Sequence, residues 1–153
     1  ELLSFTRLPE MPLAIEASQQ QLKEVGIEAK IRKVEVSAVA TEKDYAFTPY
    51  AVVAAPIGDP YAYFNSAVKT GGVGNIGHYS NAEADQKIEA LATETDQKKR
   101  IQLSKDIQAL MDKDHGYTII GFYKVAIVMD KSISHLESHP TDYYHVTNKL
   151  SKE

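Results

Sequence analysis

The sequence predicts an α/β fold with a mixed, largely parallel sheet flanked by helices. Three observations favour this fold class: an apolar stretch at residues 2–8, a helical pattern at residues 9–25, and alternating apolar residues at 27–36. Strand, helix and strand in this order form a βαβ unit, in which the two strands run parallel. The chain of 153 residues is long enough for one ordinary domain with a hydrophobic core.

The first helix is predicted between the apolar stretch and Gly26. Pro12 is tolerated in a first helical turn, and Ile15, Leu22 and Val25 recur at helical spacing. Gly26 stands where a left-handed residue closes a helix.

Three further segments read as strands. Residues 27–36 alternate, with a phase slip at Arg32 and Lys33 that indicates a bulge. Residues 50–55 form a continuous apolar run, which favours a strand buried on both faces. Residues 117–129 are also rich in strand-forming side chains.

Two consecutive helices follow residue 80. Asn81 and Asp96 are their predicted N-caps, and Gly116 follows the second helix. The predicted apolar stripes are Ala84, Ile88, Leu91 and Ala92 in the first helix, and Leu103, Ile107, Leu110 and Met111 in the second.

Composition excludes several classes of function. The formal net charge of −4 provides no basic field, so no nucleic-acid partner is expected. With no cysteine, the chain has no disulfide, thiolate metal site or cysteine nucleophile. No apolar run approaches the roughly 20 residues that span a bilayer. Because Glu1 is not an initiator Met and already starts a predicted strand, we expect the chain to be a piece of a longer protein, expressed as such or released by proteolysis.

Candidate binding residues gather in two turn-rich segments. Residues 56–60 are a dense turn followed by aromatic side chains, and residues 70–77 contain four glycines. The glycine segment lacks the ending of a phosphate loop and the third glycine of a dinucleotide site. It is therefore either a surface loop or a backbone-lined rim of a ligand site.

Single polar residues in these segments do not indicate catalysis. Asp59 has no second carboxylate at a recognisable spacing, and no Ser/His/Asp order is signalled, so no catalytic residue is expected. Its expected role is to accept hydrogen bonds from backbone N–H groups of its turn. His78, after the glycine segment, is either a solvated loop histidine or a ligand for a metal or its chelator.

Several pieces of the chain, in order, resemble the peptide/nickel class (family 5) of ABC-transporter solute-binding proteins. They are the Leu-Lys-Glu-Val-Gly-Ile run at residues 22–27, the Gly-Asp-Pro at 58–60, and residues 75–85 and 96–100. The resemblance implies that residues 1–130 are the second lobe of a type II periplasmic-binding-protein-like fold. It further implies that residues 131–153 are a tail returning towards a first lobe.

The nickel-type subgroup is favoured by the same resemblance. Peptide-binding members carry an aspartate where this chain has Pro56, whereas nickel-type members resemble the Ala-Pro to Asp-Pro turn at residues 55–60 and the ending at residues 139–150. Two departures are Val53 or Ala54 and Ile57, which stand where nickel-type members place aromatic residues.

The function implied is non-enzymatic capture of a solute, by hinge closure, for an ABC importer. The ligand is nickel or another transition metal as a small organic chelate, carried as cargo with no resident cofactor. The implied binding residues are Ala54, Ala55, Pro56, Ile57, Asp59, Tyr61, Asn75, His78 and Tyr79, with His78 as the metal contact.

Partners and location follow from the same resemblance. Expected partners are the absent N-terminal lobe, an ABC permease in the membrane and, for the isolated lobe, a second copy of itself. The location is extracytoplasmic, either periplasmic or as a cell-surface lipoprotein. Three alternatives stay open: a peptide-binding protein of the same family, an independent α/β regulatory or enzymatic domain, and a structural interaction module.

Overall fold

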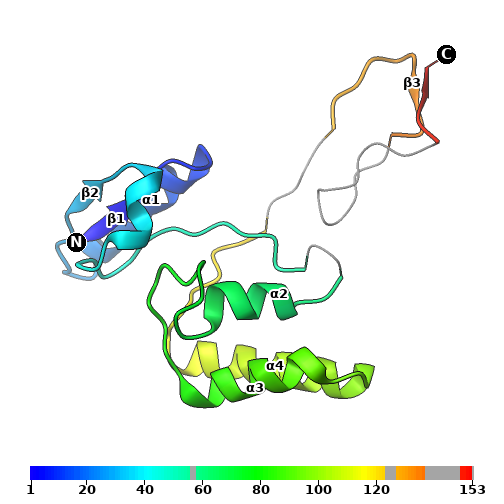
Figure 1. Cartoon of the computed structure of the whole chain (residues 1–153). Helices are drawn as coiled ribbons and strands as arrows, with labels where there is room; N and C mark the ends of the chain where they lie inside the picture. The colour runs from blue at the N-terminus through cyan, green and yellow to red at the C-terminus, as the bar shows by residue number, and fades with distance from the viewer. Residues whose placement is uncertain (56–57, 123–126, 137–148, 153) are drawn as a thin grey trace. The chain divides into compact units, whose positions relative to one another are not determined.

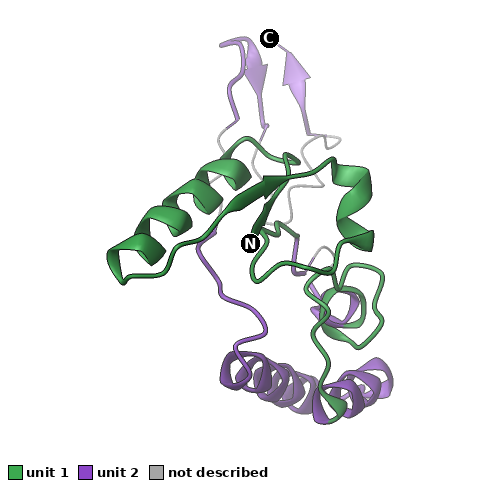
Figure 2. Ribbon diagram, turned by 90° about the vertical axis from the view of Figure 1, so that its left-hand side faces the viewer, with its two compact units in different colours: residues 1–52, 65–82 green, residues 53–64, 83–153 purple. Residues whose placement is uncertain are grey.

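A computed structural model of the chain describes residues 1–55, 58–122, 127–136 and 149–152. The chain divides into two compact units, shown in different colours in Figure 2. Unit 1 comprises residues 1–52 and 65–82, and unit 2 comprises residues 53–64 and 83–153. Within the described stretches, no helix combines the length and apolar character needed to cross a membrane.

Unit 1 begins with the predicted βαβ arrangement, visible in blue and cyan in Figure 1. Strand β1 (Leu2–Ser4), helix α1 (Glu10–Glu24) and strand β2 (Ile31–Lys33) follow one another. The two strands are parallel, with Leu2 opposite Ile31 and Ser4 opposite Lys33. The α/β fold class and the parallel pairing predicted from the sequence are therefore confirmed.

The strands are shorter than predicted, and the predicted bulge is absent. Arg32 and Lys33 pair with Leu3 and Ser4 in continuous register, so the phase slip in the apolar pattern has another origin. On the other side of β1, the Leu3 N–H donates to the carbonyl of Phe47 over 2.8 Å. This contact adds an isolated parallel bridge to the pair.

Helix α1 ends as its sequence predicts. Gly26 has a φ of +84°, its N–H donates to the Lys23 carbonyl, and the Ile27 N–H donates to Leu22. These contacts satisfy carbonyls that the helix end leaves without partners. Inside the unit, the core cluster combines strand, helix and loop residues: Leu3, Phe5, Met11 and Val39, with Leu8, Val34, Tyr45, Ala51 and Ile76 packed against them.

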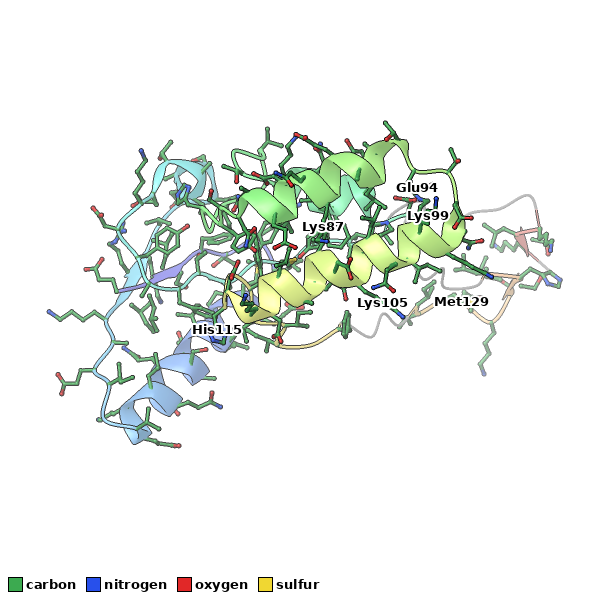
Figure 3. The ribbon with its side chains drawn as sticks, turned by 90° about the horizontal axis from the view of Figure 1, so that it is seen from below. Lys87, Glu94, Lys99, Lys105, His115 and Met129 are labelled. Carbon is green, nitrogen blue, oxygen red and sulfur yellow. The ribbon has the colours of Figure 1, made fainter. Side chains whose placement is uncertain are left out.

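Unit 2 contains two consecutive helices, α3 (Ala82–Thr93, whose first residue is counted in unit 1) and α4 (Gln97–Lys113). They lie side by side in Figures 1 and 3, and Lys87 of α3 forms an ion pair with Asp106 of α4 over 3.4 Å. The Asp96 side chain accepts from the Lys99 N–H over 2.9 Å, which confirms the predicted N-cap. The fully buried positions of the predicted stripes are Ala84, Ile88, Leu91 and Ile107.

Short elements complete the described chain. Helix α2 (Tyr61–Tyr63) continues into a π-helix (Phe64–Val68), and a 3₁₀ helix (Val36–Thr41) follows β2. In the tail, strands β3 (Ile133–Ser134) and β4 (Ser151–Lys152) pair antiparallel as a second two-stranded sheet, so the described strands form two small sheets rather than the single mixed sheet that was predicted.

Two strand predictions are wrong. Residues 50–55 form no strand, and Val52 is 49% exposed rather than buried. The described parts of residues 117–129 also form no strand, and Phe122 is 88% exposed. A strand needs a hydrogen-bonded neighbour, and no described strand pairs with either run, so apolar character alone did not produce sheet structure there.

Candidate functional site

The residues proposed from the sequence fall in both units. In unit 1 the described candidates are Asn75, His78 and Tyr79, and in unit 2 they are Ala54, Ala55, Asp59 and Tyr61. Pro56 and Ile57 lie outside the described residues. The two sets of candidates are therefore described separately, each within its own unit.

An open hollow of about 460 Å³ lies against the glycine-rich segment of unit 1. Its lining residues are Ala40, Thr70, Gly71, Gly72, Val73, Asn75, Ile76, His78, Tyr79 and Ser80. A hollow of this volume falls in the range of small-molecule sites. All three unit 1 candidates line this hollow, so it is the surface on which a ligand-site rim is considered below.

Asn75 shapes the wall of this hollow. The residue is 7% exposed, and its Nδ2 donates to the carbonyls of Lys69 over 3.1 Å and Tyr79 over 2.7 Å. Its Oδ1 accepts from the Tyr79 N–H over 3.0 Å. Because both amide ends are engaged within the loop, Asn75 closes residues 69–79 on themselves and holds the buried Tyr79 in the wall.

Two glycines let the loop pack closely against the π-helix. A Cβ at Gly72 would stand 2.3 Å from the Ser66 carbonyl oxygen, which is far inside van der Waals contact. A Cβ at Gly74 would stand 2.8 Å from the Ser66 Oγ and 2.9 Å from the Tyr50 hydroxyl. Glycine is therefore needed here for close approach, and the loop is a tightly packed turn.

His78 presents an oriented imidazole at the rim. Its backbone has a φ of +53°, a left-handed conformation uncommon outside glycine, and its N–H donates to the Asn75 carbonyl over 3.2 Å. Its Nε2 lies 3.0 Å from the carbonyl oxygen of Glu42. Because a carbonyl only accepts, Nε2 is the donor in this contact, and Nδ1 is the ring nitrogen that the contact does not use. Metal-binding histidines are commonly oriented by this kind of contact.

The segment that meets His78 is itself anchored. Arg32 forms ion pairs with Glu42 over 2.7 Å and with Glu1 over 2.8 Å, and these hydrogen bonds, Glu42 first, raise the pKa of its guanidinium. The Tyr45 hydroxyl donates to the Ile76 carbonyl. Burial, together with the charge of Glu42, raises the pKa of that phenol.

In unit 2, Asp59 is held by an arginine that sequence reasoning did not single out. Its Oδ1 accepts from the Tyr61 N–H over 2.8 Å, the role that the turn pattern predicts. Its Oδ2 accepts from Nε of Arg100 over 3.1 Å and also from Nη2. Nη1 of Arg100 donates to the carbonyls of Leu91 and Glu94, each over 2.6 Å. Through Arg100, the carboxylate of Asp59 thus links the turn before α2 to helices α3 and α4.

The other described candidates of unit 2, Ala54, Ala55 and Tyr61, carry no charged side chain. Ala54 is exposed, and Ala55 and Tyr61 are partly buried. Across the described residues of both units, no three His, Cys, Asp or Glu side chains cluster closely enough to hold a metal ion.

Comparison with known proteins gives a consistent set of relatives. The chain is 24% identical over 155 residues to the nickel-binding protein NikA of Staphylococcus aureus, a match that covers all of this chain and 32% of NikA. A crystal structure of that NikA in complex with Ni(L-His)2 superimposes with a TM-score of 0.75. The chain matches no protein-family model.

Two other solved structures share the fold at 25% identity. A nickel ABC transporter protein from Bacillus halodurans gives a TM-score of 0.76 over 97% of this chain and 32% of its own. A putative peptide-binding protein, AppA, from Clostridium difficile gives 0.79 over 99% of this chain and 33% of its own. The chain is homologous to the staphylococcal protein and has a type II periplasmic-binding-protein fold, and it spans about a third of its relatives' length.

Proposed function

We propose that this chain is the second lobe of an extracytoplasmic solute-binding protein that supplies an ABC importer. The homology to NikA and the fold shared with two transport proteins support this assignment. Coverage of about a third of each relative fits one lobe of a two-lobed protein. The whole protein closes by a hinge around its ligand and performs no chemistry.

The proposed ligand is nickel, or a similar transition metal, held by a small organic chelator such as histidine. One observation carries this choice: the His78 ring is oriented by the Glu42 carbonyl, with Nδ1 unused by that contact at the rim of the hollow. We assign Nδ1 as the atom that meets the metal, because the neutral imidazole nitrogen is a preferred ligand for such ions. Asn75 and Tyr79, which line the same hollow, form the wall behind it.

The proposal has consequences for partners and place. The first lobe completes the site, and a permease in the membrane accepts the ligand from the closed protein. The protein works outside the cytoplasmic membrane, either free in a periplasm or anchored at the cell surface as a lipoprotein. An isolated second lobe binds its ligand weakly, because half of the walls are missing, and associates with another copy of itself.

Titration calorimetry of the full-length protein with nickel(II) and L-histidine tests the ligand. The His78→Gln variant should bind at least about tenfold more weakly, since even outer partners of metal ligands cost that much. His115→Gln is the matched control, because His115 has the same φ of +53° but lies beyond the end of α4 in unit 2. Equal affinities for His78→Gln and the wild type would remove His78 from the site.

Peptide capture is the second candidate, because the structural match to the clostridial AppA has a TM-score of 0.79. The same calorimeter decides between the two ligand classes. Tight binding of unmodified dipeptides, with no response to nickel plus histidine, would favour a peptide-binding protein of the same fold.

A further inference from the structure

We propose that Arg32, on strand β2, is a positioning residue for the imidazole of His78 and acts through the segment at Glu42. The proposal deepens the function given above and rests on it, because it concerns how the chain prepares its candidate ligand atom. Arg32 does not line the hollow, so its effect on binding is indirect.

The first step is that Arg32 holds the segment of residues 42–44 from three directions. Its Nη1 donates to Glu42 Oε2 over 2.7 Å, and its Nη2 donates to the Asp44 carbonyl over 3.4 Å. Its Nε donates to Glu1 Oε2 over 2.8 Å, which fixes the guanidinium plane at the start of β1. The planar fork of arginine suits such multiple contacts, whereas a lysine reaches fewer of them.

The second step is that the arginine is one of several anchors of this segment, beside Tyr45, which packs against the core of unit 1, and the Ala46 N–H, which donates to the Glu1 carbonyl over 2.9 Å. Residues 42–45 belong to no helix or strand, and the Glu42 N–H donates to Val39 at the end of the 3₁₀ helix over 3.2 Å. The Glu42 side chain is 25% exposed and that of Arg32 is 32% exposed, so the pair is partly shielded from solvent. Arg32 is therefore the side-chain anchor of Glu42 itself, the residue whose carbonyl meets His78.

The third step is that the anchored segment meets the glycine-rich loop at two points. The Glu42 carbonyl accepts from His78 Nε2 over 3.0 Å, and the Tyr45 hydroxyl donates to the Ile76 carbonyl. Without its carbonyl partner, an exposed imidazole exchanges among several staggered rotamers. With that partner, the ring is restricted to one orientation, and Nδ1 is presented in one direction.

The test in the absence of ligand is nuclear magnetic resonance of the 153-residue chain. In the wild type, three-bond couplings should report one χ1 rotamer for His78, and nuclear Overhauser contacts should join its ring to residue 42. In Arg32→Met the couplings should average and those contacts should weaken, while amide shifts of α1 stay in place. Glu42→Gln should act in the same direction, because it keeps the carbonyl but removes the charge that Arg32 binds.

Lys33→Met is the matched control, since Lys33 is the next residue of β2 and no contact joins it to residues 42–44 in the described chain. Arg32→Lys tests conservative rescue and should recover part of the single-rotamer signal. If Arg32→Met retains one rotamer for His78, or if Lys33→Met disturbs it equally, the positioning role is wrong. Thermal unfolding of each variant identifies a general loss of fold.

A second arm uses the full-length protein with nickel(II) and L-histidine. Arg32→Met should weaken binding by about three- to tenfold, which is less than the loss on removal of His78 itself. An unchanged affinity in Arg32→Met would overturn the role in binding. If the wild-type protein binds no nickel and histidine, the proposed ligand fails, and the rotamer result still decides whether Arg32 orients His78.

Discussion

At the scale of single residues, the candidate site depends on two glycines as much as on the larger side chains that line it. Gly72 and Gly74 have no left-handed backbone requirement, yet the atoms of Ser66 and Tyr50 leave no room for a Cβ. The rim of the hollow is therefore defined by contact between loop and π-helix. π-helical turns recur at functional sites, and here the turn supplies the surface on which the loop closes.

Substitution of Gly74 measures this closeness. Gly74→Ala should destabilise the chain by about 1–3 kcal/mol, because it forces an extra carbon into a packed contact. Urea unfolding compares it with Gly77→Ala, whose added Cβ meets nothing within 4 Å. Equal stability of the two variants would show that the loop can move to accommodate a Cβ at Gly74 without a loss of stability.

The same scale shows what the sequence can and cannot predict about the site. His78 was predicted from its place after the glycine segment, Asn75 and Tyr79 were predicted from the family resemblance, and all three line one hollow. The contact between His78 and Glu42 joins residues 36 positions apart, and no local pattern signals which carbonyl meets the ring. Arg32 and Arg100 were missed as site residues for this reason: their roles arise from tertiary contacts.

At the scale of elements, helices were predicted well because their signals are local. A cap residue, an apolar stripe and a closing glycine lie within a few turns of each other, as in α1 and α4. One detail of α4 differs from its prediction. The left-handed residue after the helix is His115, at a φ of +53°, and the Gly116 N–H donates to the Met111 carbonyl over 3.1 Å.

The N-cap of α4 allows a direct measurement. Asp96→Ala removes the acceptor of the Lys99 N–H and should cost about 1 kcal/mol of stability. Asp96→Asn retains an oxygen at the same place and should remain close to the wild type. The free energy of unfolding in urea ranks the three proteins, and an Asn variant as unstable as the Ala variant would contradict capping.

Arg100 joins the turn at Asp59, helix α3 and helix α4, so its removal should lower the stability of unit 2 by more than the loss of one ion pair. Arg100→Met should destabilise unit 2 by about 1.5–3 kcal/mol, because hydrogen bonds to charged groups contribute that much. A double-mutant cycle with Asp59→Ala should return a coupling of about 1–2 kcal/mol. Lys87→Met is the comparison, since Lys87 forms its ion pairs with Glu83 and Asp106. A coupling energy near zero between Arg100 and Asp59 would contradict the role of Arg100 in holding the turn.

Strands were predicted less well because pairing is not a local property. Residues 50–55 and β1 have similar apolar character, yet only β1 has hydrogen-bonded neighbours, at β2 and Phe47. An apolar sequence pattern shows that a segment suits a strand, but a strand forms only where a neighbouring strand is placed to pair with it.

At the scale of the whole molecule, the order of the elements carried most of the information. The resemblance rested on short motifs in a fixed order along the chain, and the relatives found by comparison include a nickel-binding protein and a nickel ABC transporter protein. The chain passes from one unit to the other at residues 52–53, 64–65 and 82–83, so each unit is built from separate stretches of sequence. Composition and periodicity contain no signal for such a division, and the boundary expected at residue 130 remains a prediction.

The apolar run that follows α4 has a practical consequence. Residues 118–122 (Thr-Ile-Ile-Gly-Phe) contain no charge, and Ile119, Ile120 and Phe122 are 75%, 66% and 88% exposed. Short uncharged segments with strong strand preference tend to stack between molecules into cross-β fibrils. Concentrated stocks of the chain are therefore at risk of fibre formation, and a lysine in place of Ile119 is a small change that would act as a gatekeeper against it.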